Sequence, residues 1–204
     1  KHIQTKVSDF ITKFKSNPQG PGINYEKIKD AADKKIYSVR IDDTYRGIVV
    51  RQEGTGIYLL LWIDHHDEAY VWARSKKCAV NKETGNIQVF DVQNSKTDDS
   101  DQERQPGIFS LFSKSDLVRL GVPQEQVNYV KCIKNTDEFH ASKEALPADA
   151  YEYLEWLLND IPIQEVLEMA AENNGVSSIS DSMELALNNP GTRKSFLVVE
   201  GEKE

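Results

Sequence analysis

Five side chains between positions 40 and 70 have the chemistry of a phosphate-handling site. Arg40 and Arg46 carry planar guanidinium groups that can hold a phosphate through paired hydrogen bonds. His65 and His66 can transfer protons, because an imidazole titrates near neutral pH. Tyr70 offers a hydroxyl donor or a surface on which a base can stack. We take these five residues as the candidate catalytic residues.

Each of these residues also has a purely structural interpretation. The two arginines can instead pair with Asp42, Asp43 or Asp64 and close a hairpin. The adjacent histidines can cap or pack a junction between a strand and a helix. Neighbouring residues of an extended chain point to opposite sides, so we expect at most one histidine to face a given site. Tyr70 and Trp72 lie two apart on the expected helix, so they do not share a face and we expect one in the core.

Three successive strands are expected to position these side chains. Residues 36–41, 45–51 and 57–63 are rich in β-branched and aromatic types. Residues 42–44 and 53–56 read as the turns between them, and the second turn contains two glycines that tolerate positive φ. The third strand, IYLLLWI, shows no polar alternation, which predicts burial on both faces.

A helix is expected directly after the third strand. Asp64 or Asp67 can cap its first turn, and Lys76 and Lys77 suit its last turn because of the helix dipole. This places both histidines at the junction and Tyr70 on the helix.

The hairpin segment RIDDTYR (40–46) and the segment HHDEAYVWA (65–73) together resemble a known family. They are similar to the RelE/ParE toxin superfamily, with the hairpin closest to the HigB-like subgroup. The second segment, HHDEAYVWA, also resembles the N-terminal region of certain UvrD-type superfamily I DNA helicases, which carry such a domain ahead of the motor. The segments SDLVRLGVP (115–123) and LPADAYEYLEWL (146–157) look like the helical part that follows it there.

The resemblance implies an α+β fold, with a small antiparallel sheet and helices on one face. It also implies that a metal-independent endoribonuclease is an alternative function. In such enzymes the 2′-hydroxyl attacks the adjacent phosphate, which requires a base, an acid and cations around the phosphate. No cofactor or metal is implied. Active toxins of this kind often carry a strongly basic helix or Lys-rich strand ends, and a catalytic group near the C-terminal edge of the domain. Residues 78–92 here are nearly neutral, as suits a member that binds a protein.

Composition places the chain among globular proteins. Of its 204 residues, 39% are hydrophobic and 28% are charged. No run of eighteen apolar residues occurs, so we expect no membrane span. The first residues, KHIQTKVSDF, lack an apolar signal core, and we expect a cytoplasmic protein. Cys78 and Cys132 show no metal-binding spacing and are expected to be reduced, structural cysteines.

Charge is distributed unevenly along the chain. Residues 1–77 hold 14 Lys and Arg against 10 Asp and Glu, a net charge of +4. Residues 78–204 hold 11 against 23, a net charge of −12. The basic half is expected to bind nucleic acid, DNA or RNA. The acidic half is expected to contact a protein partner or to mask the basic half within the same chain.

Two domains are expected from the pattern of apolar residues. Residues 1–92 form the toxin-like domain, with helices at 7–14 and 23–29 before the strands and a hairpin at 78–92 after them. Residues 93–107 contain none of the hydrophobic residue types and are expected to be a flexible linker.

Residues 108–190 are expected to form a small, acidic, all-α domain, and residues 191–204 a tail. Helices are predicted at 116–120 with a cap at Ser113 or Ser115, after Pro123, and at 148–158, 163–171 and 183–187. Asp137, Glu138 and His140 are expected on a solvated helix face.

The first hypothesis is therefore an accessory, non-motor region of a UvrD-type helicase-like protein, whose toxin-fold domain binds nucleic acid or a protein. Residues 191–195 (GTRKS) resemble the end of a phosphate loop, but no glycine stands at the required upstream spacing, so a motor would belong to another part of the protein. The alternatives are a metal-independent mRNA endoribonuclease of the RelE/HigB type and a non-catalytic protein-interaction module.

Overall fold

The computed structural model describes residues 2–52, 54–92, 106–174 and 182–200. Contacts divide the chain into two compact units, which we treat separately. The first unit comprises Lys1–Cys78 and Arg193–Glu204, and the second comprises Ala79–Thr192. This division differs from the expected boundary, because it assigns the end of the chain to the first unit.

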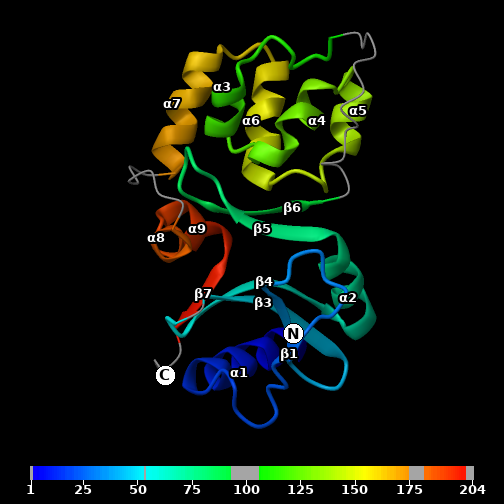
Figure 1. Ribbon diagram of the computed structural model, residues 1–204, viewed down its shortest axis with the longest axis vertical. Helices are drawn as coiled ribbons and strands as arrows, with labels where there is room; N and C mark the ends of the chain where they lie inside the picture. The colour runs from blue at the N-terminus through cyan, green and yellow to red at the C-terminus, as the bar shows by residue number, and fades with distance from the viewer. Residues whose placement is uncertain (1, 53, 93–105, 175–181, 201–204) are drawn as a thin grey trace. The chain divides into compact units, whose positions relative to one another are not determined.

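A five-stranded antiparallel sheet forms the centre of the first unit (Figure 1). The strand order in the sheet is β1-β2-β3-β4-β7. The strands are β1 (Glu26–Lys27), β2 (Ile36–Arg40), β3 (Tyr45–Gln52), β4 (Ile57–His65) and β7 (Leu197–Glu200). The three central strands confirm the prediction from the β-branched and aromatic runs. The expected tail, in contrast, contributes β7, which pairs with Ile57–Leu60 of β4 because its own Leu197–Val199 run is apolar.

Local hydrogen bonds and backbone angles account for the two turns. Asp42 accepts bonds at 2.8 Å from the backbone N–H groups of Thr44 and Tyr45, which closes the β2–β3 turn. Gly54 and Gly56 have φ of 76° and 66°, a region that side chains disfavour. Both turn predictions are therefore confirmed.

Helix α1 (His2–Ser16) covers one face of the sheet. Its Phe10 and Phe14 are buried, and their rings stack with centroids 5.3 Å apart. Phe14 also meets the ring of Tyr58 edge-on at 5.1 Å. The other buried members of this cluster are Ile23, Val39, Val49, Leu60 and Val199. The predicted amphipathic helix at 7–14 is thus confirmed, and it supplies the core of this face.

Helix α2 (His66–Ser75) lies on the opposite face. The Tyr70 hydroxyl lies 3.0 Å from the Ser38 hydroxyl, and Ser38 alternates along β2 with Val39 of the α1 cluster. The expectation of helices on one face only is therefore wrong. Two faces need cover because the middle of β3, Gly47–Val50, is buried throughout.

A β-bulge changes the alternation of side chains along β4. Val49 pairs with Leu60 and Ile48 pairs with Trp62, so Leu61 is an extra residue without a cross-strand partner. Leu60 and Ile63 both belong to the α1 side, whereas Trp62 contacts α2. The extra residue therefore moves Trp62 to the α2 face, where strict alternation from Leu60 would not place it.

Three further local expectations are wrong. Residues 23–29 form a turn and the edge strand β1 rather than a helix, and the backbone N–H of Arg40 donates to the Ile23 carbonyl at 2.5 Å. Neither Asp64 nor Asp67 caps α2, whose N-cap is His65 without a side-chain bond. Lys76 and Lys77 begin the strand β5 (Lys76–Val80) instead of ending the helix.

The second unit contains a two-stranded hairpin and a set of helices (Figure 1). Strands β5 and β6 (Ile87–Asp91) confirm the predicted hairpin, and Gly85 in its turn has a φ of 69°. The helices are α3 (Lys114–Arg119), α4 (Val127–Lys131), α5 (Thr136–Ala141), α6 (Ala148–Leu158), α7 (Ile163–Asn174), α8 (Met183–Leu187) and the start of α9 (Pro190–Ser195), which passes into the first unit at Arg193. The regular elements that the structure describes within residues 108–190 are helical, but the unit as a whole also includes the hairpin.

Helix caps and one apolar cluster organise the second unit. The Ser113 hydroxyl accepts from the Asp116 N–H at 3.0 Å, and the Asn135 side chain accepts from the Glu138 N–H at 2.9 Å. The core is built from apolar residues of α3 to α7, among them Leu117, Phe139, Leu154 and Val166, and from Phe109 in the turn before α3. The face with Asp137, Glu138 and His140 is exposed, as predicted.

Buried polar groups tie the hairpin to the helices of the second unit. Asn81 donates to the Val118 carbonyl at 3.0 Å, and Gln126 donates to the carbonyl of Asp91 in β6 at 3.2 Å. The backbone N–H of Ile87 donates to the Thr192 hydroxyl at 2.9 Å. These bonds satisfy groups that would be costly to bury alone. They assign the hairpin, expected in the first domain, to the second unit.

Two expectations concern residues at the margins of the description. Residues 93–105 of the expected linker lie outside the described residues. Gly107, its last member, packs against the carbonyls of Lys131 and Ile133, and the N–H of Ile108 donates to Ile133 at 2.8 Å. Residues 201–204 of the expected tail also lie outside the described residues. No described helix is both long enough and apolar enough to cross a membrane.

Candidate functional site

Strand register places both candidate arginines in one row across the sheet. Arg40 of β2 is the partner of Arg46 of β3, and Arg46 is the partner of Asp64 of β4. Directly paired residues of neighbouring strands project from the same face. The two guanidinium groups and the Asp64 carboxylate therefore share the α2 face, at the end of the sheet nearest the β2–β3 turn.

Both arginines are engaged within the turn. Arg40 forms an ion pair with Asp43, and the Arg46 guanidinium donates to the carbonyls of Asp42 at 2.8 Å and Tyr45 at 3.1 Å. The structural interpretation is thus confirmed for Arg40, which pairs with Asp43, whereas Arg46 closes the turn through backbone carbonyls. The Arg40 and Asp43 side chains remain 38% and 91% exposed, so a dissolved anion can reach the pair.

His66 and Tyr70 lie on the same face as the arginines. Their rings stack with centroids 4.8 Å apart, one turn from each other on α2. The Tyr70 hydroxyl lies 3.0 Å from that of Ser38, which precedes Arg40 by two residues on β2 and so projects from the same face. The N–H of His66 also donates to the Thr44 carbonyl at 2.9 Å, which fixes the start of α2 beside the turn.

His65 is separated from the other four candidates. Its ring lies against that of Tyr45, with centroids 4.5 Å apart, and these two residues are cross-strand partners one position away from the arginine row. They therefore project from the α1 face. The prediction that adjacent histidines diverge is confirmed, and the site residues that the structure brings together are Arg40, Arg46, His66 and Tyr70.

The carboxylate of Asp67, which the sequence suggests only as a helix cap, orients the His66 ring. The His66 Nδ1 and Asp67 Oδ1 atoms lie 2.8 Å apart. When Nδ1 donates to this carboxylate, Nε2 is left as the proton acceptor of the neutral imidazole. This arrangement is what a general base requires.

Two tryptophans that the sequence does not mark as site candidates also lie on this face. The rings of Trp62 and Trp72 stack nearly parallel, at 6° and with centroids 5.7 Å apart. The Trp62 indole N–H donates to Asp64 at 3.3 Å. Neither Tyr70 nor Trp72 is a core residue, because the buried residues of α2 are Ala69 and Ala73. The bulge explains the omission, since a run without polar alternation predicts no exposed tryptophan.

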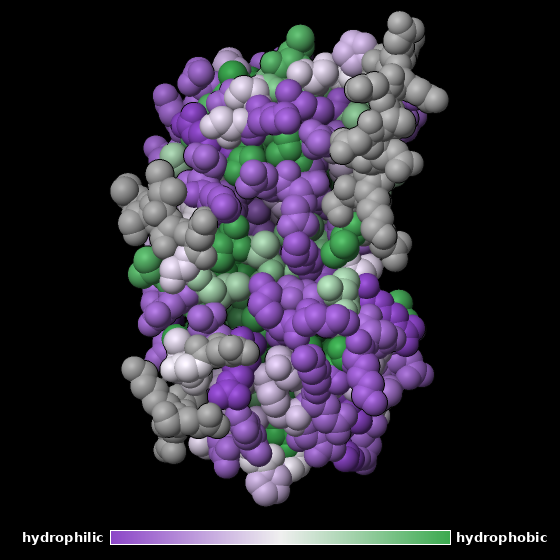
Figure 2. Space-filling view, in the orientation of Figure 1, coloured by the Kyte–Doolittle hydropathy of each residue, from purple (hydrophilic) through white to green (hydrophobic). Residues whose placement is uncertain are grey.

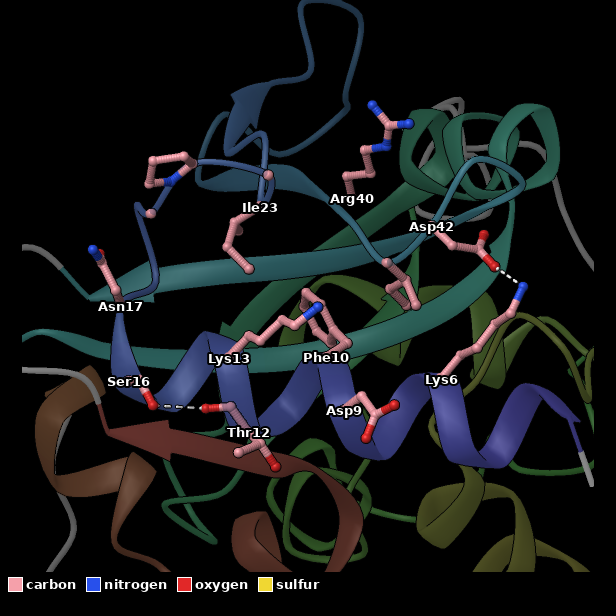
Figure 3. Close-up of a pocket in the computed structure, with 14 residues that line it drawn as sticks. Lys6, Asp9, Phe10, Thr12, Lys13, Ser16, Asn17, Ile23, Arg40 and Asp42 are labelled. Atoms are coloured by element: carbon pink, nitrogen blue, oxygen red, sulfur yellow. Dashed lines mark hydrogen bonds and ion pairs between the residues drawn. The ribbon is translucent and has the colours of Figure 1, made fainter.

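A groove of about 540 Å³ lies between α1 and the segment that follows it (Figure 3). The Lys6 ammonium contacts the Asp42 carboxylate at 2.6 Å there, and Lys13 extends along the groove. The Lys6 ammonium and the N–H of Tyr45 hold the pKa of Asp42 at about 2. Arg40 borders the groove, but its guanidinium points away from α1 (Figure 3). Arg40 therefore borders the groove, while its guanidinium group belongs to the α2 face.

The remaining titratable groups do not add a second reactive centre to the described part of the first unit. Cys78 is fully buried, and this burial raises the pKa of its thiol to about 12, which suits a structural cysteine. The described residues contain no cluster of three or more His, Cys, Asp or Glu that could hold a metal ion. The visible face of the first unit is mainly hydrophilic (Figure 2).

Comparison with known proteins identified no matching family model, curated protein or solved structure. The site must therefore be interpreted from its own geometry.

Proposed function

We propose that the first unit is a nucleic-acid-binding module that contacts phosphate through Arg40 and Arg46. In this proposal it is a RelE/ParE-like domain of the cytoplasm that serves as an accessory, non-motor region of a UvrD-type helicase-like protein. One observation carries the binding proposal. Two arginines, a histidine and a tyrosine, each at least partly exposed, lie on one face of the sheet, although they come from β2, β3 and α2.

The chemistry of this face suits a phosphate backbone. Two adjacent guanidinium groups can hold phosphate oxygens through charge-assisted hydrogen bonds. Asp43 occupies Arg40 in the free protein, and an exposed ion pair of this kind contributes only about 0–1 kcal/mol. A phosphate can therefore replace the carboxylate at small cost, and Asp43 acts as a competitor for the site.

The test measures binding of the full chain to labelled RNA and DNA oligonucleotides by fluorescence anisotropy. Arg40→Gln should weaken binding by roughly tenfold, the effect of losing a hydrogen bond to a charged group. It should also reduce the slope of log K against log salt by about 0.7 for a single strand. Asp43→Asn should act in the opposite direction and strengthen binding, because it frees Arg40.

Arg74 provides a matched control within the same unit. It forms an exposed ion pair with Asp30 at 2.5 Å, at the other end of α2. Arg74→Gln removes the same charge as Arg40→Gln and should leave the affinity nearly unchanged. Equal effects of the two variants would indicate attraction by net charge alone, and the proposed site would be wrong.

The His66–Asp67 contact favours a second candidate function, metal-independent RNA cleavage. In this reaction His66 Nε2 takes the proton of the 2′-hydroxyl, whose oxygen then bonds to phosphorus while the bond to the 5′-oxygen breaks. The departing 5′-oxygen takes up a proton from water, and a 2′,3′-cyclic phosphate remains. Cleavage of a translated mRNA in chelator should be lost in His66→Gln and retained in His65→Gln. Cleavage that survives both changes would exclude His66 as the base.

A further inference from the structure

Trp62 is unusually exposed for its size. It is 44% exposed although one side of its ring stacks on Trp72, so the exposed area lies on the rest of the indole. Stacking on Trp72 and the bond to Asp64 fix the orientation of the ring. An exposed indole held in one orientation loses little conformational freedom when another flat molecule stacks on it.

The position of Trp62 relative to the arginines is set by the strand. Trp62 and Asp64 are two residues apart on the same face of β4, a spacing of about 7 Å. Asp64 stands in the row of Arg46 and Arg40. The described part of β7 pairs with β4 only as far as Leu60, so it does not cover this end of the strand. An aromatic surface thus lies one row away from the two cations.

We propose that Trp62 is a stacking platform for a base of single-stranded nucleic acid whose phosphate is held by Arg40 and Arg46. This inference rests on the proposed function and narrows its ligand to unpaired strands. Cationic side chains beside an aromatic ring are the combination used to bind single strands without sequence preference. Bases within a duplex stack on each other, so their faces are closed to an external indole.

A protein partner is the competing occupant of this surface. Val71 on α2 is 56% exposed, so apolar contact with a partner would also cover part of this face. The charges favour nucleic acid, because the neighbouring row contains Arg46 and Arg40, and the Asp64 carboxylate already accepts from Trp62 and from the His65 N–H at 2.8 Å.

The experiment compares oligo-dT and oligo-rU with a duplex of equal length, using the full chain. Anisotropy gives the affinity, and quenching of tryptophan fluorescence reports stacking. Single strands should quench the fluorescence and the duplex should not. Trp62→Leu should weaken single-strand binding by roughly tenfold and remove most of the quenching, since stacking on one base contributes at about that level.

Two variants control for folding and for the other tryptophans. Trp62→Phe keeps an aromatic ring and should retain most of the affinity. Trp156→Phe changes a half-buried tryptophan of the second unit, which packs edge-on against Tyr153, and should leave the oligonucleotide-induced quenching in place. Unfolding temperatures should be similar for all three variants, because none of these side chains is fully buried.

The outcomes separate this inference from the proposed function. Equal affinity for duplex and single strand, with Trp62→Leu unchanged and Arg40→Gln weakened, would overturn the stacking platform and leave phosphate binding standing. Absence of binding to every nucleic acid would overturn both. Full quenching retained in Trp62→Leu would also overturn the platform, because another tryptophan would then be the one in contact.

Discussion

The two faces of the first unit's sheet are built from the same strands but carry different kinds of side chain. Beneath α1, alternate residues of β2, β3 and β4 contribute to an aromatic and aliphatic cluster with Phe10 and Phe14. Beneath α2, the row nearest the turn carries Arg40, Arg46 and Asp64, and the helix adds His66 and Tyr70. Both faces bury apolar residues, since Ile36 and Ile48 beneath α2 are as buried as the α1 cluster. Strand alternation places the ionisable groups of the row nearest the turn on the α2 face.

The two neighbouring histidines project from opposite faces of the sheet. His65 stacks on Tyr45 toward the α1 face, whereas His66 stacks on Tyr70 on the α2 face. A single step along the chain at the β4–α2 junction separates a packing residue from a candidate base. The comparison therefore predicts that changes in the α1 cluster lower stability, and that changes in the row nearest the turn on the α2 face lower binding.

The strongest test of this division is Phe14→Ala. Phe14 is 1% exposed and packs between Phe10 and Tyr58, so truncation leaves a cavity in the α1 cluster. We expect a loss of about 3–5 kcal/mol in the free energy of unfolding, measured by urea denaturation. Val71→Ala, an exposed change on α2, should stay within about 0.5 kcal/mol. A loss below about 1 kcal/mol for Phe14→Ala would show that α1 is not part of the stabilising core.

A smaller loss of stability is expected when the hydrogen bond between α2 and the sheet is removed. Tyr70→Phe removes the hydroxyl that contacts Ser38 at 3.0 Å and should cost about 0.5–1.5 kcal/mol in the free energy of unfolding. Ser38→Ala removes the other partner and should cost a similar amount. The double variant should cost less than the two single changes together, because they share one bond. Strict additivity would mean that this bond does not hold α2 in solution.

The smallest effect concerns the ion pair between Asp42 and Lys6 beside the groove. The folded-state pKa of Asp42 is lowered from 3.8 to about 2, so its contribution is present above about pH 4 and is lost as the pH falls through 2. Asp42→Asn should cost at most about 1 kcal/mol in the free energy of unfolding at neutral pH, because the pair is near the surface. The difference from wild type should shrink at acidic pH.

Asp43→Asn is the matched control for this pH dependence. Asp43 is the next residue, but its side chain is 91% exposed and pairs with Arg40 on the other face. Its replacement should change the unfolding free energy little at either pH while it strengthens oligonucleotide binding. A stability loss equal to that of Asp42→Asn would contradict the assignment of the two carboxylates to different tasks.

Local patterns were sufficient to predict much of the first unit. The β-branched runs of β2 and β3, the glycines at 54 and 56, and the apolar spacing of α1 each indicate their structure through short-range effects. The helix predicted at 23–29 is wrong. The apolar spacing of this segment also fits a turn from which Ile23 packs into the α1 cluster. The edge pairing of Glu26 and Lys27 with β2 depends on a distant strand, which local propensity does not reveal.

The candidate site was predictable in its residue types and partly in its geometry. Divergence of His65 and His66 follows from the backbone period alone. The Arg40–Arg46 pairing follows from the hairpin register that the 42–44 turn fixes. The exposed Trp62 was not predictable, because the bulge at Leu61 shifts the alternation by one residue and a bulge leaves no signal in an unbroken apolar run.

By itself, the sequence determined the strands and turns around the hairpin, the amphipathic α1 and most helices of the second unit, since these depend on neighbours within a few residues. Only the tertiary structure decided that α2 lies opposite α1, that residues 197–200 return to the sheet as β7, and that Arg40, Arg46, His66 and Tyr70 share one face with Trp62. The physical reason is that cross-strand register, bulges and helix docking are set by burial of surfaces contributed by distant segments. No single segment encodes that burial.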